Sequence, residues 1–298
     1  MMPAAAPSLR GQLLRSEPMS RHTSWRVGGP ADRLYIPADL EDLAAFLASL
    51  PPQEPLAWVG LGSNLLVRDG GVRGTVVMTS GALSKLDLIG EALVRAEAGV
   101  ASAKVARFCV DQGLTGAEFL AGIPGTVGGA LAMNAGAFGG ETWNIVAAVE
   151  TIDHRGALRV RPPADYRIGY RALSGPAGEW FVAGHFRLRA GDAAHGKTLI
   201  KSLLARRGAS QPTQLPNAGS VFKNPQGDFA ARLIETAGLK GACVGRACVS
   251  ELHANFIVNN GGATAADIER LIARVQAEVE KRHGIKLEPE VRVIGEKD

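Results

Sequence analysis

The clearest alternation of hydrophobic and polar residues follows a helical period and lies near the C-terminus, between Thr264 and Gly284. The apolar positions of this segment fall on one side of a helix: Ile268, Leu271, Ile272, Val275 and Val279. Thr264 with Asp267 three residues later is a capping pattern, and Gly284 is a typical helix terminator. We therefore predict a helix here, followed by a strand over 286–294, where apolar and polar residues alternate.

The remaining pattern predicts helices and strands in mixture. Helical spacing is found over 39–50, 101–112, 197–207 and 229–237. Asp228 is the expected N-cap of the last of these helices. Strands are predicted over 57–67, with an interruption at 60–64, and over 74–78, 146–152, 158–161 and 180–188. This mixture predicts an α+β protein, and the polar segment 208–214 is its expected domain boundary.

Length and glycine content refine this picture. A chain of 298 residues is long for one hydrophobic core, so two or three substructures are expected. Glycine accounts for 37 residues, well above the usual share, and it gathers around 60–74, 113–140 and 238–262. We interpret these clusters as loops whose backbone closely approaches a ligand.

Charge and cysteine content exclude several classes of protein. The net charge is +4, the basic residues are scattered, and there are only three tyrosines, which argues against nucleic-acid binding and suits a small anionic ligand. The three cysteines, without a C-x-x-C pair, argue against a disulfide framework or a zinc site. No secretory signal or membrane-spanning apolar run is recognisable, so we expect a soluble cytoplasmic protein.

The segment Gly122–Gly140, GIPGTVGGALAMNAGAFGG, holds seven glycines in nineteen residues and no charged side chain. Exposed N–H groups in such a turn can form an anion-binding concavity, which indicates a phosphate. The segment fits neither of the common phosphate-binding motifs, so an ordinary glycine-rich loop stays an alternative.

Two further segments could carry chemistry. Residues 60–69, GLGSNLLVRD, place small polar groups after a strand, where they could contact a pyrophosphate or form an ordinary turn. In residues 217–225, NAGSVFKNP, the hydroxyl of Ser220 could project into a cleft or be satisfied within a strand. No G-x-S-x-G motif supports a hydrolase. By pattern alone, Glu290 and Arg171 would be ordinary surface charges and His253 a packed side chain.

The order of these segments resembles the UDP-N-acetylenolpyruvoylglucosamine reductases, the MurB enzymes of peptidoglycan synthesis. The resemblance covers about 23–295 and rests on the motifs TSWRVGGPAD, GLGSNLLV, GIPGTVGGALAMNAGAFG, GYR, AGSVFKNP, LIETAGLKG, HANFIVN and LEPEV. It implies the FAD-binding fold of the vanillyl-alcohol oxidase (PCMH) type. The expected domains are an FAD-binding subdomain over 1–80, a second over 81–205 and a substrate-binding domain over 206–298.

The resemblance implies hydride transfer from NADPH to non-covalently bound FAD, and from the flavin to the enolpyruvyl group of a UDP-sugar. The residues expected to hold FAD lie in three segments: Arg26, Val27 and Gly28; Gly60, Leu61, Gly62, Ser63 and Asn64; Gly122, Ile123, Pro124, Gly125, Thr126, Gly128 and Gly129.

The resemblance also assigns the catalytic positions. Ser220 is the expected general acid that protonates the carbon beside the substrate carboxylate, and Arg171 and Glu290 flank that carboxylate. We hypothesise that Glu290 is protonated and donates a hydrogen bond. The expected substrate contacts are Tyr170, Lys223 and Asn224, and no metal is expected.

Some features depart from the family pattern or leave alternatives open. His22 stands where relatives often have asparagine, and many relatives have glycine and glutamine in the segment that reads GRACV over 245–249 here. The length fits the shorter, type II form, and we expect a monomer. An FAD-dependent sugar or alcohol oxidase of the same fold is the alternative enzyme, although the loop 60–64 has no histidine for covalent FAD. A non-catalytic nucleotide-binding module is the alternative outside enzymes.

Overall fold

The structure is a computed structural model in which residues 9–298 are described. The chain forms two compact units. The first unit takes in the residues up to 15, 33–60 and 74–200, and the second takes in 16–32, 61–73 and 201–298. The division into three domains at residues 80 and 205 stays a prediction.

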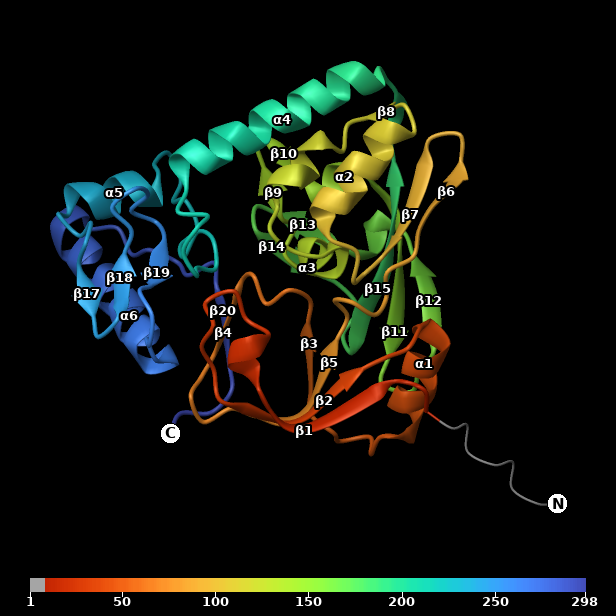
Figure 1. The fold of residues 1–298 in the computed structure, drawn as a ribbon, viewed down its shortest axis with the longest axis horizontal. Helices are drawn as coiled ribbons and strands as arrows, with labels where there is room; N and C mark the ends of the chain where they lie inside the picture. Colours follow the sequence, from red (N-terminus) through yellow and green to blue (C-terminus); the bar gives the residue numbers. More distant parts are fainter. Residues whose placement is uncertain (1–8) are drawn as a thin grey trace. The chain divides into compact units, whose positions relative to one another are not determined.

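An antiparallel sheet of five strands forms the centre of the first unit (Figure 1). Its strand order is β12-β11-β15-β7-β6, with β6 at Leu86–Gly90, β7 at Leu93–Glu97, β11 at Val146–Asp153, β12 at Leu158–Arg161 and β15 at Glu179–Arg187. Helix α1 (Leu40–Ser49) contributes Leu43 and Leu47 to a buried cluster with Ile152 and Val182 of the sheet. The amphipathic pattern of α1 thus anchors it in this core.

A second sheet has the strand order β1-β2-β5-β3. Its strands are β1 at Gln12–Pro18, β2 at Pro30–Ile36, β3 at Leu56–Val59 and β5 at Val72–Met78. Strands β3 and β5 run parallel. The chain passes between the two units within β1, β2 and β5.

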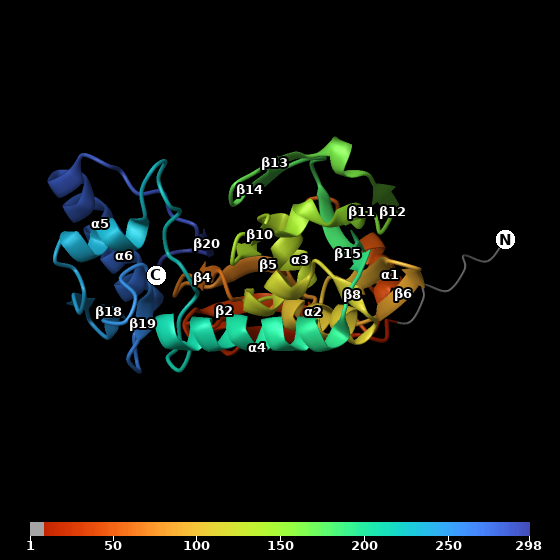
Figure 2. The ribbon, with the colours of Figure 1, turned by 90° about the horizontal axis from the view of Figure 1, so that it is seen from above.

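Two shorter features of the first unit position site residues. Helix α2 (Ser102–Asp111) begins beside the first half of the glycine-rich segment, and helix α3 (Val127–Ala132) lies within that segment. Strands β13 (Arg167–Gly169) and β14 (Ala172–Ser174) form the hairpin seen in Figure 2. Gly169 pairs with Ala172, so the two-residue tip of this hairpin is Tyr170–Arg171.

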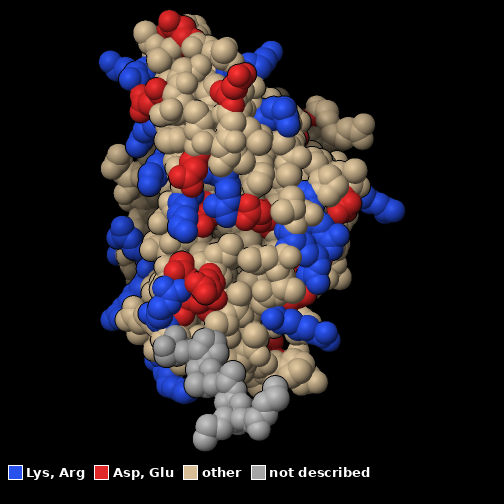
Figure 3. Space-filling model, turned by 90° about the vertical axis from the view of Figure 1, so that its right-hand side faces the viewer, with Lys and Arg blue, Asp and Glu red and all other residues tan. Residues whose placement is uncertain are grey.

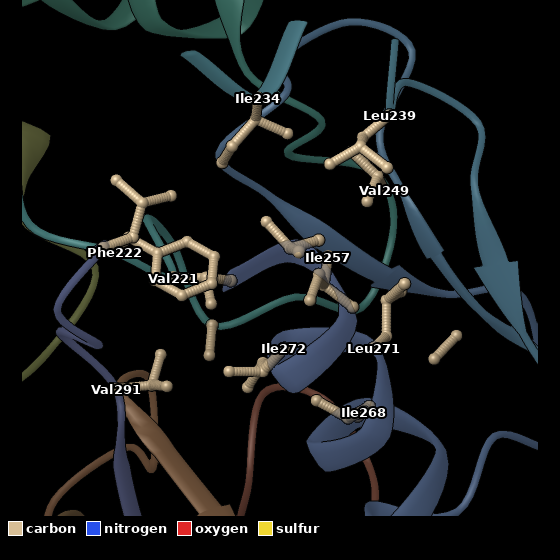
Figure 4. Close-up of a cluster of buried hydrophobic side chains, with 14 of the residues drawn as sticks. Val221, Phe222, Ile234, Leu239, Val249, Ile257, Ile268, Leu271, Ile272 and Val291 are labelled. Carbon is tan, nitrogen blue, oxygen red and sulfur yellow. The ribbon is translucent and has the colours of Figure 1, made fainter. Parts of the chain in front are cut away.

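The second unit is built around one apolar cluster (Figure 4). Helices α5 (Ala230–Thr236) and α6 (Ala265–His283) pack with a sheet of β17 (Cys243–Val244), β18 (Ala247–Val249) and β19 (Ile257–Asn259). Strand β20 (Arg292–Ile294) pairs in parallel with β4 (Leu65–Val67). The cluster fixes the segment that carries Ser220, because Val221 and Phe222 are almost fully buried in it.

The other elements are short or connecting. They are helix α4 (Ala193–Ser210), strands β8 (Leu114–Thr115), β9 (Gly136–Ala137), β10 (Gly140–Glu141) and β16 (Arg189–Ala190), and 3-10 helices η1 (Met19–Arg21), η2 (Glu118–Gly122), η3 (Thr142–Asn144) and η4 (Pro163–Asp165). Acidic and basic side chains are interspersed on the face of the molecule in Figure 3.

Most predicted helices and strands are confirmed. For helix α6, the capping residues explain where the helix begins and ends. Helix α6 begins with the capping box of Thr264 and Asp267 and ends at Gly284, whose φ is 68°. Two predictions are wrong. Within 286–294 only Arg292–Ile294 forms a strand, and Val293 is exposed.

The second error concerns the cap of α5. The Asp228 carboxylate accepts from Phe229 N and binds Arg232, whereas the Asn224 side chain accepts from Ala230 N at 3.1 Å. The first free N–H of the helix is therefore satisfied by a residue six positions upstream, which a local pattern does not reveal.

Candidate active site

The first half of the glycine-rich segment is a tight loop packed against Gly60. A Cβ at Gly60 would lie 2.2 Å from the Thr126 hydroxyl oxygen, so only glycine permits this approach. The N–H groups of Gly125, Val127 and Gly128 donate to the carbonyls of Ile123, Val100 and Ala98. These three donors are therefore engaged within the protein.

Two hydroxyl groups at this loop differ from these backbone donors in their hydrogen bonding. The side-chain oxygens of Ser102 and Thr126 are buried and have no hydrogen-bond partner among residues 9–298. Ser102 is held next to the loop because its N–H donates to Gly125 O at 2.9 Å. Since a buried hydroxyl without a partner is costly, the pair indicates a place built for a polar ligand.

The second half of the segment surrounds Arg171. The guanidinium Nη2 donates to Gly136 O at 2.6 Å and Nη1 donates to Asn134 O at 3.4 Å. The guanidinium also lies 5.5 Å from the ring centre of Tyr170, which is half exposed. The structure thus brings the predicted residues Tyr170 and Arg171 together at one hairpin tip.

In the second unit, the loop 23–28 lies against residues 62–64. Ser24 N donates to Gly62 O at 3.2 Å, and a Cβ at Gly62 would lie 2.1 Å from His22 O. The exposed Arg26 has a φ of 58°, which is unfavourable for a residue other than glycine. Strained backbone of this kind concentrates at binding sites. Six predicted cofactor residues share this region: Arg26, Val27, Gly28, Gly62, Ser63 and Asn64.

Backbone hydrogen bonds join the segments of Ser220 and Glu290. Glu290 N donates to Val221 O at 2.8 Å, and Lys223 N donates to Glu288 O at 2.9 Å. The Asn64 amide donates to Glu290 O at 3.1 Å. The residue next to Ser220 is therefore bonded directly to Glu290.

Asn255 completes this arrangement. Its amide donates to Phe222 O at 2.8 Å and its side-chain oxygen accepts from Phe222 N at 3.0 Å, so both backbone groups of Phe222 are held. Asn255 O also accepts from Val221 N at 2.9 Å. Because Asn255 is almost fully buried, these bonds are shielded from competing water.

Two predicted substrate contacts have partners within the protein. The Lys223 ammonium forms an ion pair with Glu288, and Asn224 caps α5 as described above. Either side chain can reach a substrate only by sharing or exchanging these contacts.

Known proteins share this arrangement of segments. A family model for a FAD binding domain matches residues 31–160, and a model for the C-terminal domain of UDP-N-acetylenolpyruvoylglucosamine reductase matches residues 211–294. The chain is 61% identical over 296 residues to the UDP-N-acetylenolpyruvoylglucosamine reductase of Alkalilimnicola ehrlichii, covering 99% of both chains. The reductase of Methylococcus capsulatus is also 61% identical, over 98% of this chain and 96% of that protein. The chain belongs to the UDP-N-acetylenolpyruvoylglucosamine reductases.

A solved structure supports the family's fold. The reductase (MurB) from Thermus caldophilus superposes with a TM-score of 0.82 at 36% identity, covering 95% of this chain and 98% of that one. The expected PCMH-type FAD-binding fold with a C-terminal domain and the shorter form of the reductase are confirmed.

The cysteines of this reductase require a correction. The sequence argued against a disulfide framework, but Cys243 and Cys248 are joined by a disulfide. The turn at Val244–Ala247 places them directly opposite each other on β17 and β18, a pairing that a search for C-x-x-C misses. Burial raises the pKa of the Cys109 thiol to about 12, so this thiol is unreactive near neutral pH.

Asn134 and Asn255 are functional candidates that the sequence did not single out. Both are buried asparagines in motifs quoted for the family resemblance, and the side chain of each is hydrogen-bonded to a residue more than 30 residues away in the chain. His253, by contrast, is packed against Phe256, and burial lowers its pKa below the usual value. Among the described residues, no group of three or more metal-ligating side chains is found, and no helix is long and apolar enough to cross a membrane.

Proposed function

We propose that Ser220, Arg171 and Glu290 carry out the chemistry of this FAD-dependent oxidoreductase. The chain reduces the enolpyruvyl ether of UDP-N-acetylglucosamine to UDP-N-acetylmuramate in peptidoglycan synthesis, with NADPH as the hydride donor. The observation that carries the residue assignment is the bond from Glu290 N to Val221 O, which fixes Glu290 next to the Ser220 segment.

The residues of the first unit fit FAD. The unpartnered hydroxyls of Ser102 and Thr126 would donate to the cofactor, and the glycine at position 60 lets the backbone lie close to the Thr126 hydroxyl. In the second unit, the strained loop at Arg26 and the residues 61–64 would hold it further. When bound, FAD would supply the hydride chemistry that links NADPH to the substrate. The loop 60–64 has no histidine, so we propose that FAD is bound without a covalent link.

Hydride addition to the enolpyruvyl methylene carbon leaves negative charge at the carbon beside the carboxylate. The Ser220 hydroxyl donates a proton to that carbon, which completes the reduction. A neutral serine is a weak acid, so a nearby positive charge must favour loss of its proton. Arg171 supplies that charge and binds the carboxylate, where the charge of the transition state is spread.

The anaerobic half-reactions of Ser220→Ala test this assignment. NADPH should bleach the flavin of this variant at the normal rate, because Ser220 takes no part in that step. Reoxidation by the enolpyruvyl UDP-sugar should slow by about 10² to 10⁴-fold, as is typical for loss of a general acid. Ser210→Ala removes a serine whose hydroxyl donates to Arg206 O within α4, and it serves as the control. Equal slowing of both half-reactions would contradict the role of Ser220.

Glu290 can be tested in the same assay. If the Glu290 carboxyl is protonated and donates a hydrogen bond, glutamine replaces it as a neutral donor of similar size. We expect Glu290→Gln to retain at least about ten times the reoxidation rate of Glu290→Ala, since one hydrogen bond to a charged group is worth about 1.5–3 kcal/mol. Equal loss in the two variants would show that the negative charge itself is needed.

Three properties complete the proposal. We propose that the enzyme is cytoplasmic and monomeric and that its partner is the UDP-sugar rather than nucleic acid. The interspersed charges in Figure 3 fit a protein without an extended basic surface on that face. Light scattering at micromolar concentration measures the oligomeric state, and a mass near twice the 31.2 kDa of one chain would contradict the monomer.

A further inference from the structure

We infer that Asn134 is a positioning residue that holds Arg171 in its working place. The inference rests on the proposed function, because it requires that Arg171 act on the substrate. It gives the second half of the glycine-rich segment a task separate from cofactor binding. Four observations in the first unit support it.

The first observation is the position of Arg171. Arg171 and Tyr170 form the tip of the β13–β14 hairpin, whose residues are mostly exposed. A two-stranded hairpin alone is only marginally stable in water. The hairpin therefore needs anchors near its tip if the guanidinium is to keep one position.

The second observation is that the Asn134 side chain provides such an anchor. Its amide nitrogen donates to Gly169 O at 3.0 Å, at the base of the tip, and to Glu141 Oε2 at 2.9 Å. Its oxygen accepts from Trp143 N at 3.1 Å. Asn134 is only 1% exposed, so its amide connects the exposed hairpin to the buried part of the unit.

The third observation is that the anchoring is reciprocal. While the Asn134 side chain holds the hairpin, Arg171 donates to the carbonyls of Asn134 and Gly136. An added Cβ at Gly136 would lie 2.5 Å from Gly140 O and 3.0 Å from Arg171 Nη1, so any side chain there would disturb the guanidinium.

The fourth observation is backbone strain at both ends of this contact. The φ angles are 47° at Asn134 and 50° at Arg171, in the left-handed region that costs residues other than glycine free energy. Asparagine tolerates this region best, and its amide is what the site uses. Strain retained at two residues that bind each other indicates selection for their geometry.

Asn134→Gly tests the inference, because glycine adopts the same backbone angle without strain and removes only the side chain. We expect reoxidation of the flavin by the enolpyruvyl UDP-sugar to slow by about 10-fold or more, since misplacement of a catalytic group by 1 Å can cost about 100-fold. Reduction of the flavin by NADPH should stay within about two-fold of the unsubstituted enzyme.

A double-substitution cycle with Arg171→Lys separates positioning from a general structural role. If Asn134 acts through Arg171, Asn134→Gly should slow reoxidation much less in the Arg171→Lys enzyme than in the unsubstituted one. If the two effects simply multiply, the inference is overturned. Thr142→Val is the matched control, because it removes the bond from Thr142 to Ala135 O in the same loop without touching the hairpin. Equal slowing in this control would also overturn the inference.

The single variants distinguish failure of the inference from failure of the proposed function. If Arg171→Lys reoxidises at the normal rate, the proposed role of Arg171 fails. If Arg171→Lys is slow but Asn134→Gly is normal, the role of Arg171 stands and only the positioning role of Asn134 fails.

Discussion

The two halves of the glycine-rich segment 122–140 have similar composition but use their hydrogen-bonding groups in different ways. In the first half, several backbone N–H groups are engaged internally, while the buried hydroxyl of Thr126 has no partner in the described part of the chain. In the second half, the Asn134 side chain donates to Gly169 O in the hairpin, and the Arg171 guanidinium donates to the carbonyls of Asn134 and Gly136. The difference teaches that glycine content marks close backbone approach, whereas the distribution of unsatisfied polar groups marks where a ligand goes.

The energetics agree with this division. An unsatisfied buried hydroxyl costs about 1–3 kcal/mol, which is a large share of the stability of a domain. Such a cost at Thr126 is understandable if FAD removes it on binding. The second half carries its cost as backbone strain, and the contacts to Arg171 compensate for it within the protein.

Of the substitutions that separate the two halves, Gly136→Ala has the largest expected effect, and it changes only the second half. The new methyl group would displace either Gly140 O or the Arg171 guanidinium. We expect reoxidation by substrate to slow by about 100-fold, while the FAD content of the purified protein stays the same. Rapid-mixing absorbance and the flavin-to-protein ratio measure the two quantities. Loss of FAD from this variant would remove the distinction between the halves.

Gly60→Ala changes the contact made by the first half of the segment. Its Cβ would collide with the Thr126 hydroxyl, so either the loop or the cofactor must move. We expect FAD affinity to fall by about 10-fold or more, because overpacking typically costs 1–3 kcal/mol. Flavin fluorescence titration of the FAD-free protein measures it. Gly208→Ala in α4, where a Cβ would meet nothing within 4 Å, is the control and should bind FAD normally.

A smaller effect is expected from pH, and it concerns the sheet of the first unit. The hydrogen bonds from Arg95 to Glu150 at 2.7 Å lower the pKa of Glu150 below its usual value. The resulting stabilisation is complete above about pH 4.3 and is lost as the pH falls through the lowered pKa. The unfolding free energy falls as the solution becomes more acidic. We expect this fall to be smaller in Glu150→Gln, by about 1 kcal/mol or less. An unchanged decline in urea titrations between pH 6 and 3 would contradict this.

Local signals in the sequence predicted most of the fold. The capping box and Gly284 delimit α6, and the family motifs identify the FAD-binding fold, because these features depend on neighbours in the chain. The predicted cap of α5 and the predicted strand over 286–294 were wrong, since Asn224, six residues before Ala230, decides the first and the pairing with β4 decides the second. In the site, too, contacts between residues far apart in the chain could not be predicted. Asn134 could not be predicted from pattern, because Gly169 lies 35 residues away.

The most direct test of the division between the halves compares two threonine-to-valine substitutions of equal size. The Thr126 hydroxyl has no hydrogen-bond partner among residues 9–298, whereas the Thr142 hydroxyl donates to Ala135 O at 2.7 Å. Two quantities are measured for each variant: the FAD dissociation constant and the urea midpoint of the FAD-free protein.

We predict opposite results for the two variants. Thr126→Val should raise the FAD dissociation constant by about 10-fold or more and stabilise the FAD-free protein by about 1 kcal/mol. Thr142→Val should leave FAD affinity unchanged and destabilise the protein by about 1–2 kcal/mol. If Thr126→Val instead binds FAD normally and loses stability as Thr142→Val does, the first half of the segment is scaffold and the account is contradicted.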